Sequence, residues 1–268
     1  FGNTNEKDFA KEIEKSKNIL EDLINSKINH FSYPYGSKSD VGKREFELVE
    51  NLGFKSAVTT SVGKLSKKKN VGVFHSMSSR AAMKHAVEIE WVWDALILFD
   101  PPNVPLPGHR VYDLMDTFEH RLADWALSRT DRFAAPAELA ADYMSTRAHS
   151  TWVEGTHELM ARAVLFEDQE GGDWRLKCPR ELESSIYLAA MTMDLWPNHD
   201  AFGGPVKLIA ADPEARGAPA PAFANRALAE DFGYDYEAIP ETGHLLQIQN
   251  PEACRRSMLS FLTDNGVV

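Results

Sequence analysis

The sequence predicts an α/β protein with a parallel sheet at its core and a helical cap. Apolar runs of strand length recur at residues 71–75, 95–99, 204–211 and 234–240. Stretches with helical spacing separate these runs, and strands that alternate with helices form parallel sheets. The first three runs end at Ser76, Asp100 and Asp212, and His244 follows the fourth. Because parallel strands end at the same edge of a sheet, we expect these side chains to lie near one another.

The first 72 residues are predicted to form two helices and two strands. Apolar residues recur at helical spacing over residues 8–24, and a second helix is expected over residues 44–51, with Gly53 as its C-cap. Strands are expected at residues 29–36 and 54–60, and a basic link follows at residues 64–70.

Two motifs in this segment resemble the polysaccharide deacetylase family. They are Phe-Ser-Tyr-Pro-Tyr-Gly at residues 31–36 and Gly-Phe-Lys-Ser-Ala-Val-Thr-Thr at residues 53–60. The resemblance implies a piece of a distorted β/α barrel whose members remove acetyl groups from glycans with a divalent metal. The family's aspartate pair and His-x-x-x-His motif are absent, and Ser32 occupies an arginine position. A metal site needs three or more converging ligands, so residues 1–70 are interpreted as a remnant without deacetylase activity.

Ser76 lies between a predicted strand and a predicted helix. The apolar run at residues 71–75 leads into it, and an Ala- and Met-rich helical pattern follows. A serine at such a turn presents its Oγ next to the free N–H groups of the new helix. Residues 74–78, Phe-His-Ser-Met-Ser, resemble the nucleophile elbow Gly-x-Ser-x-Gly of the α/β-hydrolase family, with Phe74 where the family has glycine.

The order of the chemical groups extends this resemblance over residues 71–268. Ser76 comes first, an acid at a strand end follows, and His244 precedes the closing helix, which is the family's order. The resemblance implies that Ser76 attacks a carbonyl carbon, that His244 takes its proton, and that the backbone N–H of Met77 binds the oxyanion. The family's strands upstream of the nucleophile are missing, and the α/β segment of residues 1–72 stands in their place.

Two acids are candidates for the third member of a catalytic triad. Asp100 ends the strand after the nucleophile, a position that some branches of the family use, and two prolines follow it. Asp212 ends the next strand, the commoner position, with Glu214 nearby and a loop rich in Gly, Ala and Pro at residues 215–222. The stiffer turn favours Asp100, and Asp212 remains the alternative.

The helical cap is expected at about residues 108–200. Helical spacing is found at residues 112–127, 136–144, 156–165 and 181–195. Its methionines and tryptophans are expected either to pack between the cap helices or to line an apolar acyl pocket; they are Met115, Met144, Met160, Met191, Met193, Trp125, Trp152 and Trp196. Such a pocket predicts a small, rather apolar ester, thioester or lactone as the substrate.

Composition excludes several classes of function. The net charge of −11 argues against nucleic-acid binding, and no apolar run reaches the roughly 20 residues of a membrane span. The polar start, which lacks Met, is not expected to be a signal peptide, and two cysteines fit a reducing cytoplasm. We therefore expect a cytoplasmic protein that acts on a small molecule without a metal or cofactor, with a homo-oligomer left open. Five further histidines lack metal-ligand spacing and are expected at the surface or in the cap, namely His75, His109, His149, His157 and His199.

The use of lysine and arginine changes along the chain. Residues 1–72 contain 12 Lys and 1 Arg against 10 acids, whereas residues 73–268 contain 3 Lys and 13 Arg against 30 acids. Folding does not require this switch, since the two residues are near-equivalent helix formers. It suggests a chimera, a fusion or an assembly error.

Two main hypotheses follow from the sequence: an active serine hydrolase, or a chimeric or truncated chain with an incomplete oxyanion hole. A metal-dependent polysaccharide deacetylase is the weaker third.

Overall fold

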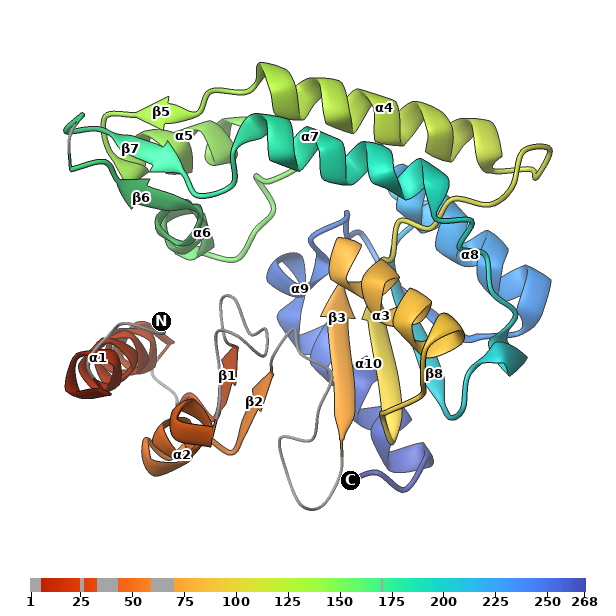
Figure 1. Cartoon of the computed structure of the whole chain (residues 1–268), viewed down its shortest axis with the longest axis horizontal. Coiled ribbons are helices and arrows are strands. Elements are labelled where there is room, and N and C mark those ends of the chain that lie inside the picture. The colour runs from red at the N-terminus through yellow and green to blue at the C-terminus, as the bar shows by residue number, and fades with distance from the viewer. Residues whose placement is uncertain (1–5, 25–26, 33–42, 59–69, 170) are drawn as a thin grey trace. The chain divides into compact units, whose positions relative to one another are not determined.

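The computed structural model describes residues 6–24, 27–32, 43–58, 70–169 and 171–268 (Figure 1). The chain divides into two compact units, residues 1–73 with 92–95 and residues 74–91 with 96–268. The predicted turn after the first strand, the end of the second strand and most of the basic link lie outside the described residues.

The first unit has the predicted order of helix, strand, helix and strand. Helices α1 (Glu6–Ile24) and α2 (Lys43–Asn51) alternate with strands β1 (His30–Ser32) and β2 (Ser56–Val58), which pair in parallel. Ile13 of α1 and Val49 of α2 are buried together with half-buried aromatic residues of this unit. Gly53, with a φ of 77°, ends α2 in the left-handed conformation that glycine adopts without strain.

A four-stranded sheet forms the centre of the α/β architecture. Its order is β3 (Val71–His75), β4 (Ala95–Phe99), β8 (Val206–Ala211) and β9 (Asp235–Ile239). Strands β4, β8 and β9 run parallel to one another. Every residue of β4 and β8 is buried, which explains why both are nearly continuous apolar runs rather than alternating patterns. The predicted parallel-sheet core is therefore confirmed.

Four helices connect or follow these strands: α3 (Met77–Glu88), α8 (Ala220–Phe232), α9 (Leu246–Gln249) and α10 (Pro251–Asp264). Both α8 and α10 contact β8. Pro251 occupies the first turn of α10, and Asn250 caps it by accepting the N–H of Ala253 at 3.1 Å. The predicted loop at residues 215–222 was too long, because α8 already begins at Ala220, where proline is tolerated in the first turn.

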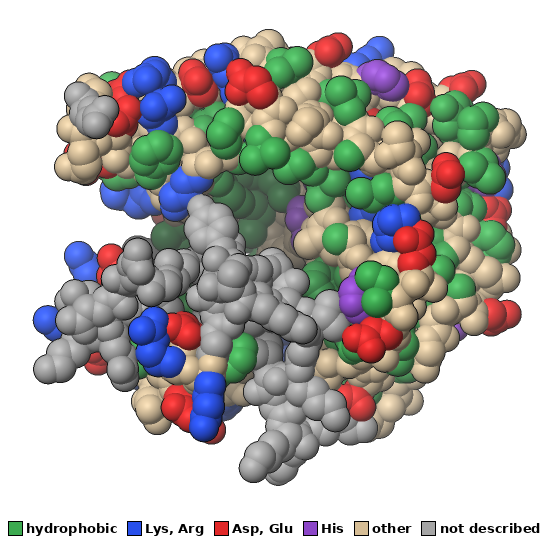
Figure 2. Space-filling model, in the orientation of Figure 1, with side chains coloured by type: hydrophobic (Ala, Val, Ile, Leu, Met, Phe, Trp, Pro, Cys, Tyr) green, Lys and Arg blue, Asp and Glu red, His purple; other side chains and the backbone are tan. Residues whose placement is uncertain are grey.

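A cap of mainly helical structure lies between β4 and β8 in the sequence. It contains α4 (Tyr112–Ser128), α5 (Pro136–Ser145), α6 (Thr156–Val164) and α7 (Arg180–Ala189), and 3₁₀ turns follow at residues 190–192 and 199–201. Helices α4 and α7 pack side by side along the top of Figure 1. Figure 2 shows acidic, basic and apolar side chains interspersed over these two helices. The four predicted helices are confirmed, although α7 ends before the predicted boundary at residue 195.

The cap also contains a small antiparallel sheet that the sequence did not predict. Strands β5 (Arg132–Phe133), β7 (Trp174–Leu176) and β6 (Leu165–Glu167) lie in the order β5-β7-β6. Phe133, Leu165 and Leu176 of these strands are buried against α5 and α6. Strands of two or three residues are too short to show a period-two pattern, so the sequence indicated helices alone.

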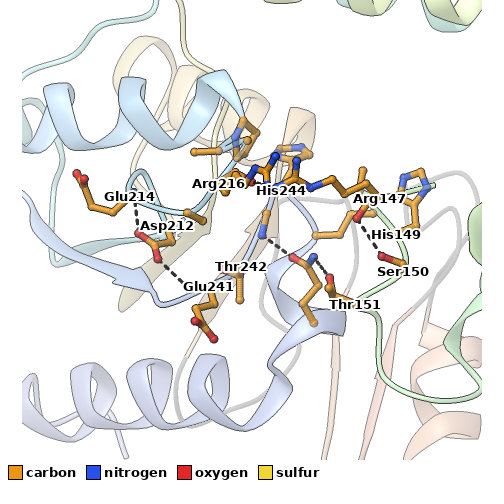
Figure 3. Close-up of a pocket in the computed structure, with 18 residues that line it drawn as sticks. Arg147, His149, Ser150, Thr151, Asp212, Glu214, Arg216, Glu241, Thr242 and His244 are labelled. Atoms are coloured by element: carbon orange, nitrogen blue, oxygen red, sulfur yellow. Dashed lines mark hydrogen bonds between the residues drawn. The ribbon is translucent and has the colours of Figure 1, made fainter.

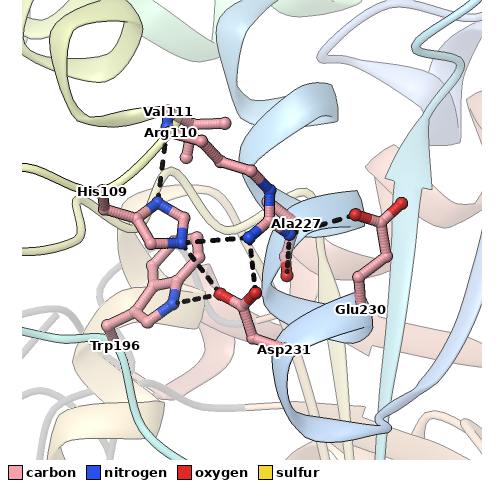
Figure 4. Close-up of polar contacts among 7 residues, drawn as sticks. All are labelled: His109, Arg110, Val111, Trp196, Ala227, Glu230 and Asp231. Atoms are coloured by element: carbon pink, nitrogen blue, oxygen red, sulfur yellow. Dashed lines mark hydrogen bonds and ion pairs between the residues drawn. The ribbon is translucent and has the colours of Figure 1, made fainter.

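The two connections of the cap are tied to one carboxylate of α8, that of Asp231 (Figure 4). His109 Nε2 and Trp196 Nε1 each lie 2.9 Å from Asp231 Oδ2, and Arg110 Nη1 donates to Oδ1 at 2.6 Å. His109 and Arg110 precede the first cap helix, and Trp196 follows the last one. This cluster therefore fixes both ends of the cap against the helix that packs on β8.

Candidate active site

The turn at Ser76 is a strained connection between β3 and α3. Ser76 has a φ of 54° and a ψ of −125°, a backbone conformation that residues other than glycine rarely adopt. Its N–H donates to the carbonyl of Phe99 at 2.9 Å, and its own carbonyl accepts the N–H of Arg80 at 3.2 Å. Ser78 fastens the turn further, because its Oγ donates to the carbonyl of His75 at 2.7 Å. The predicted tight strand-to-helix turn is confirmed, with Phe74 in place of glycine.

The structure brings Ser76, His244 and Asp100 together. Ser76 Oγ lies 2.8 Å from His244 Nε2, and His244 Nδ1 lies 2.7 Å from Asp100 Oδ2. Ser76 follows β3 and Asp100 follows β4, so neighbouring strands place both groups at one edge of the sheet. Chemically, this row of groups can move a proton from the hydroxyl to an imidazole that a carboxylate orients.

Hydrogen bonds to both carboxylate oxygens fix the position of Asp100. Its side chain is fully buried, and its second oxygen, Oδ1, accepts the N–H of Ala211 at 3.1 Å and Nδ2 of Asn225 at 3.0 Å. Its φ of 44° also places it in the left-handed region. A buried carboxylate needs such partners, since an unpaired one is costly to bury.

Asp212 has a different role in the structure. Its Oδ1 accepts the N–H of Glu214 and its Oδ2 accepts the N–H of Glu241, both at 2.8 Å. Asp212 and His244 both belong to the described residues, and no hydrogen bond or ion pair joins them. Asp212 was expected to have a less well anchored loop than Asp100, and its carboxylate joins this loop to the turn after β9.

Met77 is the first residue of α3, directly after Ser76. The first N–H groups of a helix have no partner within the helix, and the helix dipole adds positive potential there. The side chain of Ser76 makes no capping hydrogen bond to this helix. The predicted role of Met77 as an oxyanion donor fits this position and remains a prediction.

His75 contacts the backbone of His244, whereas the sequence analysis expected it at the surface or in the cap. Its Nε2 donates to the carbonyl of His244 at 2.8 Å, and the two rings lie 4.8 Å apart. Burial, helped by the neighbouring His244, lowers the pKa of His75 to about 4. His75 is therefore neutral at pH 7. Its position directly before Ser76 in the sequence was the signal that could have placed it at the site.

This lowered pKa predicts a loss of stability in acid. Between pH 6.5 and about 4 the unfolded chain protonates His75 and the folded chain does not, so lowering the pH through this window favours unfolding. In urea unfolding at pH 7.5 and pH 4.0, the parent should lose about 2–3 kcal/mol more than His75→Gln does. His120→Gln, at an exposed histidine of α4, is the matched control. Equal losses in the parent and His75→Gln would contradict the assignment.

A buried ion pair lies behind the turn at Asp100. Arg80 of α3 donates to Glu119 Oε1 of α4 at 2.5 Å and also to the carbonyl of Pro102. Both side chains are only 1% exposed. The Arg80 side chain therefore holds the two-proline turn by a hydrogen bond to the backbone carbonyl of Pro102. Arg80 was not among the residues predicted from the sequence.

A pocket of about 810 Å³ includes His244 in its lining (Figure 3). Its walls come from residues 147–151 of the cap, residues 212 and 214–219 after β8, and residues 241–245 with Gln249. Arginine, histidine, serine, threonine and acidic side chains contribute to this lining, together with alanine, glycine, proline and leucine. The pocket next to His244 therefore mixes charged groups with apolar surface.

The methionines and tryptophans of the cap do not line this pocket. Met115, Met191 and Trp196 pack with Val104 and the first turns of α8. Trp152 stacks on His157 at 5.1 Å, while Met144 is 53% and Trp125 46% exposed. The structure favours the core-packing alternative for the buried members of this set.

The chain matches no protein-family model and no curated protein. Solved structures do match it. An E-2-(acetamidomethylene)succinate hydrolase aligns with a TM-score of 0.57 at 15% identity, over 88% of this chain and 91% of that one. The peroxisomal α/β-hydrolase Lpx1 from Saccharomyces cerevisiae aligns with a TM-score of 0.54 at 14% identity, over 75% of this chain and 54% of that one.

These similarities establish the fold. The chain has an α/β-hydrolase fold with a parallel-sheet core and a cap, as the analysis of residues 71–268 predicted. The deacetylase origin of residues 1–70, the chimera and the domain boundary at residue 72 stay predictions. Within the described ranges, no three His, Cys, Asp or Glu side chains converge as metal ligands, and no helix has the length and apolar character of a membrane span.

Proposed function

We propose that this chain is a serine hydrolase that cleaves a small ester, thioester or lactone. The observation that carries the proposal is the row formed by Ser76 Oγ, the His244 imidazole and the Asp100 carboxylate, with contacts of 2.8 Å and 2.7 Å. A hydroxyl next to a base that a buried carboxylate orients is the arrangement that acyl transfer uses.

In the first half-reaction, Ser76 Oγ attacks the carbonyl carbon of the substrate while its proton moves to His244 Nε2. Asp100 stabilises the resulting imidazolium and keeps the ring in the required tautomer. The proton then passes to the leaving oxygen or sulfur as its bond to carbon breaks. In the second half-reaction, water attacks the acyl-enzyme, gives a proton to His244, and the acid departs as Ser76 recovers that proton.

The oxyanion of each tetrahedral intermediate needs a donor close to Ser76. The N–H of Met77, at the start of α3, is the donor that we assign. Backbone donors aimed at the developing charge contribute a rate factor of about 10²–10³ each in related chemistry. Because the lining mixes charged side chains with apolar surface, we do not restrict the proposed substrate to apolar compounds.

Covalent labelling by a fluorophosphonate probe tests this function. The parent chain should be labelled at Ser76 and should hydrolyse short p-nitrophenyl esters, because the activated hydroxyl is the reactive group. Ser76→Ala should lose both properties and stay folded, since removing a hydroxyl creates no cavity in the core. Ser150→Ala removes a serine that lines the pocket beside His244 and should behave like the parent.

Two outcomes would count against the proposal. If the folded parent is neither labelled nor active, the alternative of a catalytically incomplete chain is favoured. If Ser76→Ala keeps more than about a tenth of the parental activity, Ser76 is not the nucleophile, because losing a triad nucleophile normally costs far more.

A further inference from the structure

Two arginines from different parts of the fold face the pocket that contains His244. Arg147 lies in the cap, two residues after the end of α5, and Arg216 lies in the loop between β8 and α8. Arg147 Nη2 donates to the carbonyl of Arg216 at 2.6 Å, so this contact joins the two segments (Figure 3). The guanidinium of Arg147 also lies beside Gly217, where an added Cβ would come within 3.7 Å of Cζ.

Neither arginine has a carboxylate partner among the residues that the structure describes. Most cap and α8 arginines do have one: Arg110 pairs with Asp231, and Arg129 pairs with Glu183. Arg147 and Arg216 form no ion pair of this kind with the described residues. Burial lowers the pKa of His149, another basic residue of the lining, and so favours its neutral ring. The free positive charge of this pocket therefore comes from the two arginines.

The acids of the pocket are occupied elsewhere. Glu214 pairs with Arg226 at 2.6 Å, and both oxygens of Asp212 accept backbone N–H groups. The remaining acid, Glu241, points away from the two arginines in Figure 3. Two guanidinium groups without a carboxylate partner, in the same pocket as His244, suit a negatively charged group of the substrate.

We propose that Arg147 and Arg216 bind a carboxylate of the substrate, so that this site takes small esters or thioesters with a second, anionic end. The inference rests on the proposed hydrolase function and specifies its substrate class. A carboxylate matches the planar fork of a guanidinium.

A matched pair of esters tests this inference. The 4-nitrophenyl hydrogen ester of adipic acid carries a free carboxylate, and its methyl ester has the same length without the charge. The parent should show a kcat/KM about tenfold or more higher for the charged ester, mainly through a lower KM, as expected for one charge-assisted contact. Arg147→Gln and Arg216→Gln should each lower this preference by about tenfold. Arg121→Gln, at an exposed arginine of α4 outside the pocket, should keep the parental ratio.

A binding measurement separates this inference from the hydrolase proposal. Monomethyl adipate should bind to Ser76→Ala in calorimetry, and Arg147→Gln in the same background should weaken binding about tenfold. Absent binding, or equal affinities in the two variants, would overturn the carboxylate site even if the esterase is active. Binding that depends on Arg147, with no labelling of Ser76, would retain the site and reject the hydrolase.

Discussion

Asp100→Asn is expected to lower kcat for ester hydrolysis by about 10⁴-fold while the protein stays folded. The carboxylate accepts from His244 Nδ1 at 2.7 Å and so leaves Nε2 free to take the proton of Ser76. An asparagine can donate its NH₂ to Nδ1, which stabilises the wrong tautomer and no longer balances the imidazolium. Initial rates on a short p-nitrophenyl ester, with circular dichroism as the check on folding, measure the effect.

Asp212→Asn is the matched control, because Asp212 also follows a strand of the same sheet and was the competing candidate. Its carboxylate accepts N–H groups of Glu214 and Glu241, so the substitution should weaken a loop contact and lower kcat by less than about tenfold. The assignment would be reversed if Asp212→Asn were inactive and failed to react with fluorophosphonate while Asp100→Asn stayed reactive.

The sequence could predict the sheet and the order of the candidate groups because both follow from local patterns. Strands β4 and β8 are buried on both faces and appear as apolar runs, and the polar residue after each run marks the carboxyl edge. Only the two prolines after Asp100 favoured it over Asp212 in the sequence. Contacts such as the one from Asn225 to Asp100, which joins residues far apart in the chain, decide the position of a carboxylate.

The pocket could not be predicted in the same way. Arg147 and Arg216 belong to segments separated by most of the cap, and their residue types are ordinary for exposed positions. What distinguishes them is that both line one pocket and form no ion pair with its described acids, which depends on the positions of Glu214 and Arg226 in three dimensions. The methionines and tryptophans were misleading for a related reason, since helical spacing does not tell a core-facing side from a pocket-facing side.

Arg80→Met is expected to reduce the free energy of unfolding by about 3–5 kcal/mol. The change leaves the buried Glu119 carboxylate without its cation and frees the carbonyl of Pro102. Burial already raises the pKa of Glu119, and Arg80 opposes this rise. The unpaired carboxyl is therefore expected to protonate in the folded variant, which limits the cost. Urea unfolding of the parent and the variant at pH 7 measures the difference.

The double variant Arg80→Met with Glu119→Leu distinguishes a buried unpaired charge from lost packing. Replacing both partners removes the unpaired carboxylate, so the double variant should recover about 2 kcal/mol or more of the loss. It should still lie below the parent, because the carbonyl of Pro102 has lost its donor. Lys84→Met, on the same helix but in a half-exposed pair with Glu88, should change stability by less than about 1 kcal/mol. If the double variant is as unstable as Arg80→Met alone, the ion pair is not the cause, and packing around the Arg80 side chain is.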